Sequence, residues 1–339
     1  MIVVSQARVA LFGATGAVGV EMLKILEERD FPVGKLRLLT SHGGRTAVWR
    51  GQEHPVEAVG ADSFRDIDLA LFAVDGDVSR AWAPEAVRSG AVVIDNSSAF
   101  RMDDAVPLVI PEVNPEDIDA HKGIVANPNC STIIALVALH PLHRAAGIRR
   151  LIASTYQAVS GAGKAGLEEL QDQTRAWVRG EKPKVSAFAY PIAFNLIPHI
   201  DAFTENGYTK EELKMRNESR KILHAPELRV SCTCVRVPVL RSHSEALTIE
   251  TERPLTPDEA RELLRSAPGV KVVDEPSLKR YPMPLDTSDQ DLIYAGRIRV
   301  DESAEGNGLV LWVCGDQIRK GAATNAVQIA EAVWRKRAH

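Results

Sequence analysis

A short glycine-rich segment between a predicted strand and a predicted helix constrains the fold most. Gly13-Ala-Thr-Gly16-Ala-Val-Gly19 follows an apolar strand, 8–12, and precedes an amphipathic helix, 20–29. This context is typical of a dinucleotide fingerprint, because the glycines permit a tight turn and let a pyrophosphate approach the helix N-terminus. The spacing is G-x-x-G-x-x-G rather than G-x-G-x-x-G, so a plain strand-to-helix turn is the alternative.

The next segments continue the alternation of strands and helices. Apolar strands are expected at 35–39, 69–74, 91–95 and 123–126, with a helix at about 78–89. This order predicts a parallel sheet whose carboxyl edge binds ligands.

Two loops at that edge carry candidate binding groups. Arg101 closes the run Asn96-Ser-Ser-Ala-Phe-Arg101 and is a candidate anion contact, with a surface arginine as an equal alternative. The loop after the second strand holds Ser41, His42 and Arg45 but no Asp or Glu. An acid there usually binds the ribose of NAD, so this loop favours NADP, although Arg45 is equally compatible with a solvated charge.

Cys130 stands at the junction with the second half of the chain. The turn Asn127-Pro128-Asn129 precedes it, and an apolar helix is predicted from Ser131 to Leu142. Proline ends regular structure before the cysteine, and the free N–H groups of the helix start favour a thiolate. We interpret Cys130 as a nucleophile, against the alternative of a buried small hydrophobe.

The second half has the pattern of an α+β domain, in which strands recur without regular helical crossovers. Strands are expected at 149–157, 228–239, 245–250, 270–273, 292–300 and 309–314; helices are expected at 167–178, at 209–223, from 256 and at 317–337. Glu211 and Lys214 are three residues apart and share a helix face, where an ordinary solvated ion pair is the simplest interpretation.

Composition restricts the class of protein. The chain has 339 residues, 45% hydrophobic and 25% charged, with a net charge of −4. These values predict a globular protein of two domains, without nucleic acid or membrane as its main partner. The four cysteines lack paired metal spacing, so no metal is expected. We expect no signal peptide and a reducing, cytoplasmic location.

Several motifs together resemble the aspartate-semialdehyde dehydrogenase family, and the resemblance runs from Arg8 to the last helix. Besides the segments around Gly13, Arg101 and Cys130, they are Tyr156-Gln-Ala-Val-Ser-Gly161, Phe194-Asn-Leu-Ile-Pro198, Arg236-Val-Pro-Val-Leu-Arg-Ser-His243 and Arg319-Lys-Gly-Ala-Ala323. The resemblance implies an α/β fold: a Rossmann-type domain, 1–129, completed by the helix 317–339, and a glyceraldehyde-3-phosphate dehydrogenase-like catalytic and dimerisation domain, 130–316.

The resemblance also implies a reaction. Members reduce L-aspartyl 4-phosphate with NADPH, releasing phosphate and aspartate 4-semialdehyde, on the route to lysine, threonine, methionine and isoleucine. By resemblance Cys130 is the nucleophile that forms a thioester, His243 is an acid/base residue with a pKa near neutrality, and Gln157 positions the substrate. The Asn129 side chain and backbone N–H groups are candidates to stabilise the oxyanion.

The same resemblance assigns the substrate's charged groups. Arg236 matches the α-carboxylate site, Glu211 the α-amino site, and Arg101 with Lys214 the phosphate site. It therefore replaces the solvated ion pair as our interpretation of Glu211 and Lys214. No role is implied for Arg241.

Cofactor contacts follow in the same way, with NADPH as the expected cofactor. They are Gly13, Thr15, Gly16, Ala17, Val18, Ser41, Arg45, Ser160, Gly161 and Gln317. The family often carries an Arg-Ser pair after the second strand, whereas the loop 41–46 is shorter here and its arginine is displaced, which weakens the expectation of strict NADP preference.

Two alternatives stay open, and one assembly is expected. N-acetyl-glutamyl-phosphate reductase would share the dinucleotide domain, the cysteine and the histidine, but its acylated substrate amine would not need Glu211. A catalytically silent paralogue is disfavoured because Cys130, Gln157, Arg236 and His243 are all present. The resemblance, and a second-domain sheet that needs cover on one face, predict a homodimer.

Overall fold

The computed structural model describes residues 6–337, which separate into two compact units. One unit holds the described residues up to Asn129 together with those from Ala322 onward; the other runs from Cys130 to Gly321. The α/β fold class predicted from the sequence is confirmed, with a mostly parallel sheet in the first unit and a mixed sheet in the second.

The first unit contains a seven-stranded sheet in the order β3-β4-β2-β1-β5-β6-β7. Apart from the antiparallel β3–β4 pair, its neighbouring strands are parallel. The strands are β1 Ala7–Phe12, β2 Val33–Thr40, β3 Arg45–Trp49, β4 Gln52–Ala58, β5 Leu69–Phe72, β6 Val92–Asp95 and β7 Ile124–Ala126; the helices are α1 Ala17–Glu28, α2 Gly76–Arg88, the 3₁₀ turn Pro115–Ala120 and α8 Thr324–Arg337.

Alternation along β1 places apolar side chains in two cores. Val9 and Leu11 belong to the core that contains residues of α1 and α8, whereas Ala10 and Phe12 belong to the core that contains residues of α2. Successive side chains of a strand point to opposite faces, so helices cover this sheet on both sides. The carboxyl edge of the parallel strands is thereby left to the loops.

Two sequence predictions for this unit need correction. Residues 41–46 are not all loop, because Arg45 and Thr46 open β3, which pairs with β4 at the sheet edge. The last helix begins at Thr324 rather than at Gln317. Asp316 accepts hydrogen bonds from the N–H groups of Ile318 and Arg319, which bends the chain into a turn that leads into a π-helical segment, Arg319–Ala323. Residues 338 and 339 of the predicted helix lie outside the described residues.

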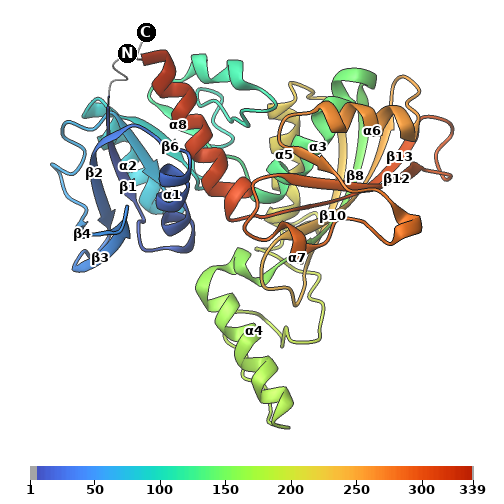
Figure 1. Cartoon of the computed structure of the whole chain (residues 1–339), viewed down its shortest axis with the longest axis horizontal. Helices are drawn as coiled ribbons and strands as arrows, with labels where there is room; N and C mark the ends of the chain where they lie inside the picture. Colours follow the sequence, from blue (N-terminus) through green and yellow to red (C-terminus); the bar gives the residue numbers. More distant parts are fainter. Residues whose placement is uncertain (1–5, 338–339) are drawn as a thin grey trace. The chain divides into compact units, whose positions relative to one another are not determined.

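The second unit contains a six-stranded sheet in the order β11-β12-β13-β10-β8-β9. Its strands are β8 Ile148–Gln157, β9 Arg229–Arg236, β10 His243–Thr251, β11 Val270–Val272, β12 Ile293–Val300 and β13 Gly308–Gly315; its helices are α3 Cys130–Ala146, α4 Gly163–Val178, α5 Lys210–Ile222, α6 Pro257–Ser266 and α7 Pro284–Thr287, with 3₁₀ turns at Val159–Ala162 and Pro276–Leu278. The helices α3, α5 and α6 pack on this sheet (Figure 1).

Local signals explain where these helices begin. Thr209 and Thr256 each form a capping box with a glutamate three residues later, at the start of α5 and α6. The threonine hydroxyl accepts an N–H of the first turn and the glutamate returns a bond, so two otherwise orphaned donors are satisfied.

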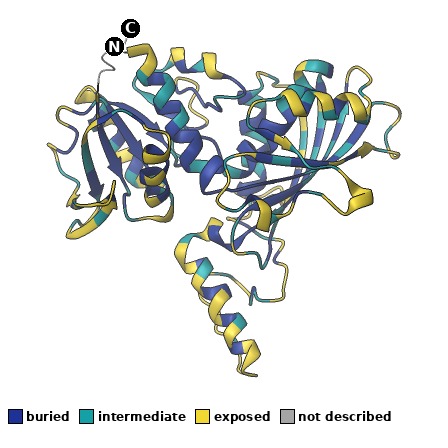
Figure 2. Ribbon diagram, in the orientation of Figure 1, coloured by how far each residue is buried: buried dark blue, intermediate teal, exposed yellow. Residues whose placement is uncertain are grey.

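Part of the second unit stays exposed. Figure 2 shows many exposed residues along α4, interspersed with buried ones. Around α4 and the loop that follows it, the large apolar side chains of Trp177, Val178, Tyr190, Phe194 and Leu196 are all exposed. Between residues 6 and 337, no helix combines the length and the apolar character needed to cross a membrane.

Candidate active site

Cys130 is the first residue of α3, as the proline-containing turn before it predicts. Its side chain is partly exposed, whereas Cys232, Cys234 and Cys314 are buried. A Cβ built on Gly321 would lie 3.0 Å from the Cβ of Cys130. The chain around residue 321 therefore passes close to the thiol, and a larger residue there would crowd it.

Gln157 connects the start of α3 with α5. Its Nε2 lies 2.9 Å from Ser131 Oγ, 3.2 Å from Glu211 Oε1 and 3.3 Å from Thr155 Oγ1. Gln157 is 2% exposed, so these acceptors replace water around its amide. The residue next to the cysteine and the carboxylate of Glu211 thus belong to one hydrogen-bonded network.

Glu211 and Lys214 form a largely buried ion pair on α5 rather than a solvated one. Lys214 Nζ lies 3.0 Å from Glu211 Oε2 and 2.9 Å from Asp201 Oδ2. Burial would lower the pKa of Lys214, but the carboxylates of Glu211 and Asp201 outweigh it and the pKa is raised. Lys214 is therefore a permanent cation.

Arg236 brings a second cation to the same region from the end of β9. It is 6% exposed, its guanidinium donates to Ala158 O at 2.7 Å, and it interacts electrostatically with Glu211 and Cys130. Burial lowers the pKa of Arg236, and Glu211 opposes that shift. Arg236 and Asp201 line a cavity of about 420 Å³.

Gly161 leaves open the space between Arg236 and His243. A Cβ built on Gly161 would lie 2.7 Å from an Arg236 guanidinium nitrogen and 3.4 Å from His243 Nε2. Because residue 161 has no side chain, this space stays open, and a small molecule in it could contact both Arg236 and His243.

His243 is the first residue of β10 and is fully buried. The N–H of Ala158 donates to its Nδ1 at 3.1 Å, so Nε2 must carry the hydrogen of the neutral imidazole. Burial, helped by the charge of Arg236, holds the pKa of His243 well below its usual value. The near-neutral pKa expected from the sequence is therefore wrong, because complete burial and the charge of Arg236 both disfavour the charged ring. Among the described residues, Nε2 has no hydrogen-bond partner.

The predicted contacts Ser160 and Gln317 meet beside the histidine. Gln317 Nε2 donates to Ser160 Oγ, and Gln317 Oε1 accepts the N–H of Ser242 at 2.9 Å. Ser160 and Gln317 are 5% and 4% exposed.

In the first unit, the glycine turn has the geometry that the sequence predicts. Gly13 has φ +95, and a Cβ there would lie 2.2 Å from Ala73 O; a Cβ on Gly19 would lie 2.1 Å from Gly13 O. Only glycine fits both positions. Gly16 is the N-cap of α1 and provides no side-chain cap, and the first turn has no acidic residue. The N–H of Gly16 donates to Gly13 O at 3.0 Å, whereas the first N–H groups of a helix, here from Ala17 onward, have no intrahelical partner. The segment 15–18 is therefore a suitable place for a pyrophosphate.

Ser41 lies near that turn, because β1 and β2 are parallel neighbours, whereas Arg45 opens β3, which β4 separates from β2. The N–H of Gly13 donates to Leu39 O at 2.8 Å, and Ser41 follows β2 directly. Ser41 and Arg45 are exposed, on either side of a turn in which the N–H of Gly43 donates to Thr40 Oγ1 at 3.0 Å.

Arg101 and Asn129 also belong to the first unit, and both are buried. Arg101 donates to Asn127 O at 2.9 Å and to Asn96 O at 2.7 Å. It therefore ties the loop after β6 to the turn that leads to Asn129.

Sequence reasoning missed residues that act only through tertiary contacts. Asp201 shares Lys214 with Glu211, and Ala158 fixes the histidine through its backbone, which no side-chain pattern reveals. Glu245 is fully buried, and neither of its oxygens has a hydrogen-bond partner within residues 6–337. The sequence offers one signal for Glu245: it follows His243 by two residues on the same strand, so the two side chains lie on the same face of the sheet.

Known proteins match the chain over nearly its whole length. Residues 8–121 match the family model "Semialdehyde dehydrogenase, NAD binding domain", and residues 139–320 match "Semialdehyde dehydrogenase, dimerisation domain". The aspartate-semialdehyde dehydrogenase of Aquifex aeolicus is 55% identical over 330 residues, covering 96% of this chain and 97% of the relative.

Similar solved structures include two complexes of aspartate semialdehyde dehydrogenases with a ligand. Aspartate semialdehyde dehydrogenase II of Vibrio cholerae complexed with ASA has a TM-score of 0.95 at 46% identity and covers 98% of this chain and 99% of that one. The Candida albicans enzyme with NADP has a TM-score of 0.76 at 25% identity and covers 99% and 100%. With this extent of similarity in sequence and fold, the chain belongs to the aspartate-semialdehyde dehydrogenase family.

Proposed function

We propose that this protein reduces L-aspartyl 4-phosphate to L-aspartate 4-semialdehyde with NADPH, through a thioester on Cys130. The observation that carries the proposal is the network Ser131–Gln157–Glu211, which couples the start of the nucleophile's helix to a buried carboxylate. A carboxylate in that place suits a substrate with a free, charged amino group.

The charged side chains suit the remaining groups of the substrate. Arg236 offers a guanidinium fork for the α-carboxylate. Lys214 supplies a permanent positive charge for the phosphate, and Arg101 of the first unit has the same role in our proposal. Glu211, whose carboxylate already contacts Gln157 and Lys214, would also pair with the amino group.

Cys130 performs the covalent step. Its thiolate attacks the carbonyl carbon of the acyl phosphate, the bond to the phosphate oxygen breaks, and a thioester forms. Arg236 and the N-terminus of α3 stabilise the thiolate. Backbone N–H groups at the helix start, with the Asn129 amide, stabilise the oxyanion. After reduction, the carbon–sulfur bond breaks and the thiolate is restored.

His243 contributes a hydrogen bond. Because Nδ1 accepts the Ala158 N–H, the neutral ring presents an Nε2–H that can donate to a developing negative charge. At that nitrogen it cannot also take the thiol proton. We therefore assign it to charge stabilisation during attack and reduction, rather than to thiol deprotonation.

The first unit is proposed as the dinucleotide-binding domain and the second as the catalytic and dimerisation domain. Bound NADPH supplies the hydride for the thioester. Gly13 and Thr15–Val18 would hold its pyrophosphate, Ser41 and Arg45 its 2′-phosphate, and Ser160, Gly161 and Gln317 its nicotinamide end. The lack of an acid after β2 and the NADP complex of the Candida albicans relative support NADP.

We further propose a homodimer formed through the second unit. The face of its sheet opposite the active-site side chains includes Ile152, Tyr156 and Trp312, which are only half-buried. The rings of Tyr156 and Trp312 pack 5.3 Å apart on that face. Apolar side chains in such an open position are typical of a surface that a second copy covers.

A direct spectrophotometric assay tests the activity. The protein is incubated with aspartate semialdehyde, phosphate and NADP, and the absorbance of reduced cofactor is followed. We expect a signal that depends on phosphate and that is larger with aspartate semialdehyde than with N-acetyl-glutamate semialdehyde. The variant Cys130→Ser should give no signal, although it should still bind the cofactor. The proposal fails if no phosphate-dependent signal appears, and the thioester mechanism fails if Cys130→Ser stays active.

A further inference from the structure

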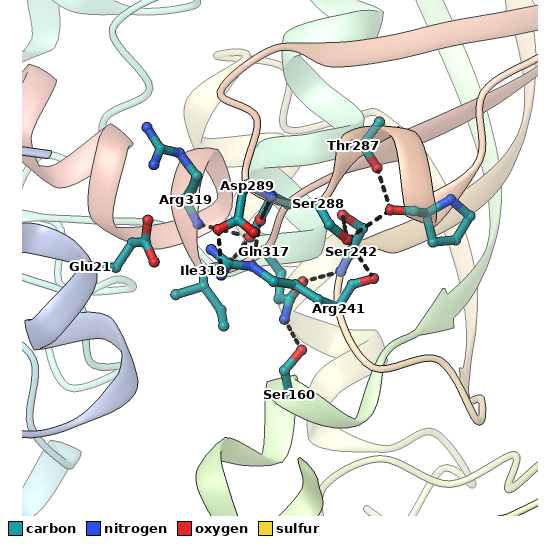
Figure 3. Close-up of polar contacts among 12 residues, drawn as sticks. Glu21, Ser160, Arg241, Ser242, Thr287, Ser288, Asp289, Gln317, Ile318 and Arg319 are labelled. Atoms are coloured by element: carbon teal, nitrogen blue, oxygen red, sulfur yellow. Dashed lines mark hydrogen bonds and ion pairs between the residues drawn. The ribbon is translucent and has the colours of Figure 1, made fainter. Parts of the chain in front are cut away.

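Arg241, which the resemblance leaves without a role, forms an ion pair with a buried aspartate. Its Nε lies 2.6 Å from Oδ2 of Asp316, which is fully buried. A second guanidinium nitrogen lies 2.8 Å from Oδ1 of Asp289, which Figure 3 shows beside Arg241. Asp316 Oδ2 also accepts the N–H of Asp289 at 2.7 Å. The arginine thus bridges two carboxylates, an arrangement that its planar fork satisfies and an ammonium group does not.

The second carboxylate oxygen of Asp316 and its backbone carbonyl stabilise the turn that leads to the proposed nucleophile. Its Oδ1 accepts the N–H groups of Ile318 at 2.9 Å and Arg319 at 3.0 Å, and its carbonyl accepts the N–H of Gly321 at 3.0 Å. The turn ends where Gly321 approaches Cys130. A displacement of Asp316 would therefore also move the backbone next to the thiol of Cys130.

Residue 242 joins Arg241 to the histidine in an unfavourable backbone conformation. Ser242 has φ 74 although it is not glycine, and it is fully buried. Such a conformation persists only where the surroundings impose it. Here the surroundings include Arg241 on one side, held by Asp316, and Gln317 Oε1, which accepts the N–H of Ser242 at 2.9 Å. The hydroxyl of Ser288 lies 3.4 Å from both Ser242 Oγ and Arg241 O. The direction in which His243 leaves the turn depends on this conformation.

The contacts close into a ring. Gln317 donates to Ser160, which follows Ala158 by two residues, and Ala158 holds His243 through Nδ1. Figure 3 shows Gln317 between Ser160 and Ser242, with Arg241 alongside. The proposed cofactor contact, the histidine and the turn at Cys130 are therefore parts of one hydrogen-bonded structure.

We propose that Arg241 and Asp316 are positioning residues: their ion pair holds Ser242 in its left-handed conformation and so aims His243 Nε2–H at the reacting carbonyl beside Cys130. This inference rests on the proposed function. Neither residue touches substrate in our assignment; both act through His243 and the 316–321 turn. Hydrogen-bond catalysis depends on placement within about 1 Å, so loss of the pair should reduce turnover by roughly ten- to a hundredfold.

The chain offers a closely matched control. Arg261 pairs with the buried Asp274 at 2.8 Å; their side chains are 23% and 1% exposed, against 22% and 0% for Arg241 and Asp316. Arg261 lies on α6 of the same unit and also bridges to a second carboxylate, Asp258, at 2.7 Å. Replacing either arginine by alanine leaves one buried carboxylate without its arginine, so the losses of stability should be similar.

The experiment compares Arg241→Ala, Arg241→Lys and Arg261→Ala in the phosphate-dependent assay. Arg241→Ala should lower kcat at least tenfold while the KM for aspartate semialdehyde changes less than about threefold. The Glu211–Lys214 pair lies outside the ring, and Arg236 keeps its own bond to Ala158 O. Arg241→Lys should recover part of kcat, and Arg261→Ala should keep kcat within about twofold. Equal kcat losses in both alanine variants, or an unchanged kcat in Arg241→Ala, would overturn the proposal.

A second variant tests the backbone argument directly. Glycine adopts φ near +74 without strain, so adding Ser242→Gly to Arg241→Ala should restore part of kcat. No recovery in the double variant would show that Arg241 does not act through Ser242.

Hydrogen exchange gives a readout that is independent of the substrate. Exchange over residues 239–246 should rise in Arg241→Ala but not in Arg261→Ala, and unchanged exchange would refute the positioning role. An inactive wild-type protein would instead count against the proposed function.

Discussion

Replacing Glu245 by glutamine should make the protein more stable than the wild type at neutral pH. Glu245 lies on β10 opposite Thr155, and Thr155 pairs with Cys234 on β9. Burial, with smaller effects from Cys234 and Glu211, holds the pKa of Glu245 well above its ordinary value of 4.5. The folded protein therefore binds this proton more tightly than the unfolded chain does.

The sign of the pH dependence follows from that difference. Stability contributed by the protonated carboxyl is fully present below pH 4.5 and is lost as pH rises toward the folded pKa. Glutamine does not titrate. The advantage of the variant should thus grow about tenfold in the folding equilibrium, or about 1.4 kcal/mol, per pH unit within that window.

Urea unfolding of both proteins between pH 4 and pH 8 measures the effect. The control is Glu169→Gln on α4, because Glu169 Oε2 accepts the N–H of Ser186 at 3.0 Å and its hydroxyl at 2.9 Å. That variant should be less stable by about 1–3 kcal/mol. The reasoning is refuted if Glu245→Gln is the less stable protein at pH 8, since the carboxylate would then be charged and stabilised in the fold.

Three further changes test the site, the cofactor loop and the assembly. Gly161→Ala should raise the KM for aspartate semialdehyde by roughly tenfold with little loss of stability, because the added methyl displaces the Arg236 guanidinium, 2.7 Å away; an unchanged KM would mean that this space is not used. Arg45→Ala should raise the KM for NADPH much more than that for NADH, and equal effects would remove Arg45 as the contact of the 2′-phosphate. Ile152→Arg places a charge on the half-buried sheet face and should convert a dimer into a monomer in sedimentation experiments; an intact dimer would place the interface elsewhere.

Local sequence patterns predicted the structure correctly where it depends only on residues that are neighbours in the chain. The glycine turn at Gly13 and the helix start at Cys130 follow from backbone sterics and from the position of Pro128, and both are found in the structure. Alternating apolar residues predicted β8, and the Thr256 cap predicted the start of α6. The fold class followed from the order of these elements.

Other features depend on contacts between distant segments. The β3–β4 hairpin was missed because Arg45–Ala58 is an edge pair with mostly exposed side chains and a weak apolar pattern. The predicted start of the last helix, Gln317, is too early, and the helix begins at Thr324. The turn before it is formed by hydrogen bonds to the buried Asp316, which a local cap pattern does not reveal. The lowered pKa of His243 comes from complete burial, which only the packed sheet creates.

Intact-mass analysis after rapid quenching tests the central claim most directly. Protein mixed with L-aspartyl 4-phosphate in the absence of NADPH should gain the mass of one aspartyl group, located by peptide mapping on Cys130. Burial raises the pKa of Cys314 to about 12, and the neighbouring Cys234 together with burial raises that of Cys232, so these thiols should stay unmodified. An adduct on another residue, or full activity without any adduct, would contradict the thioester mechanism.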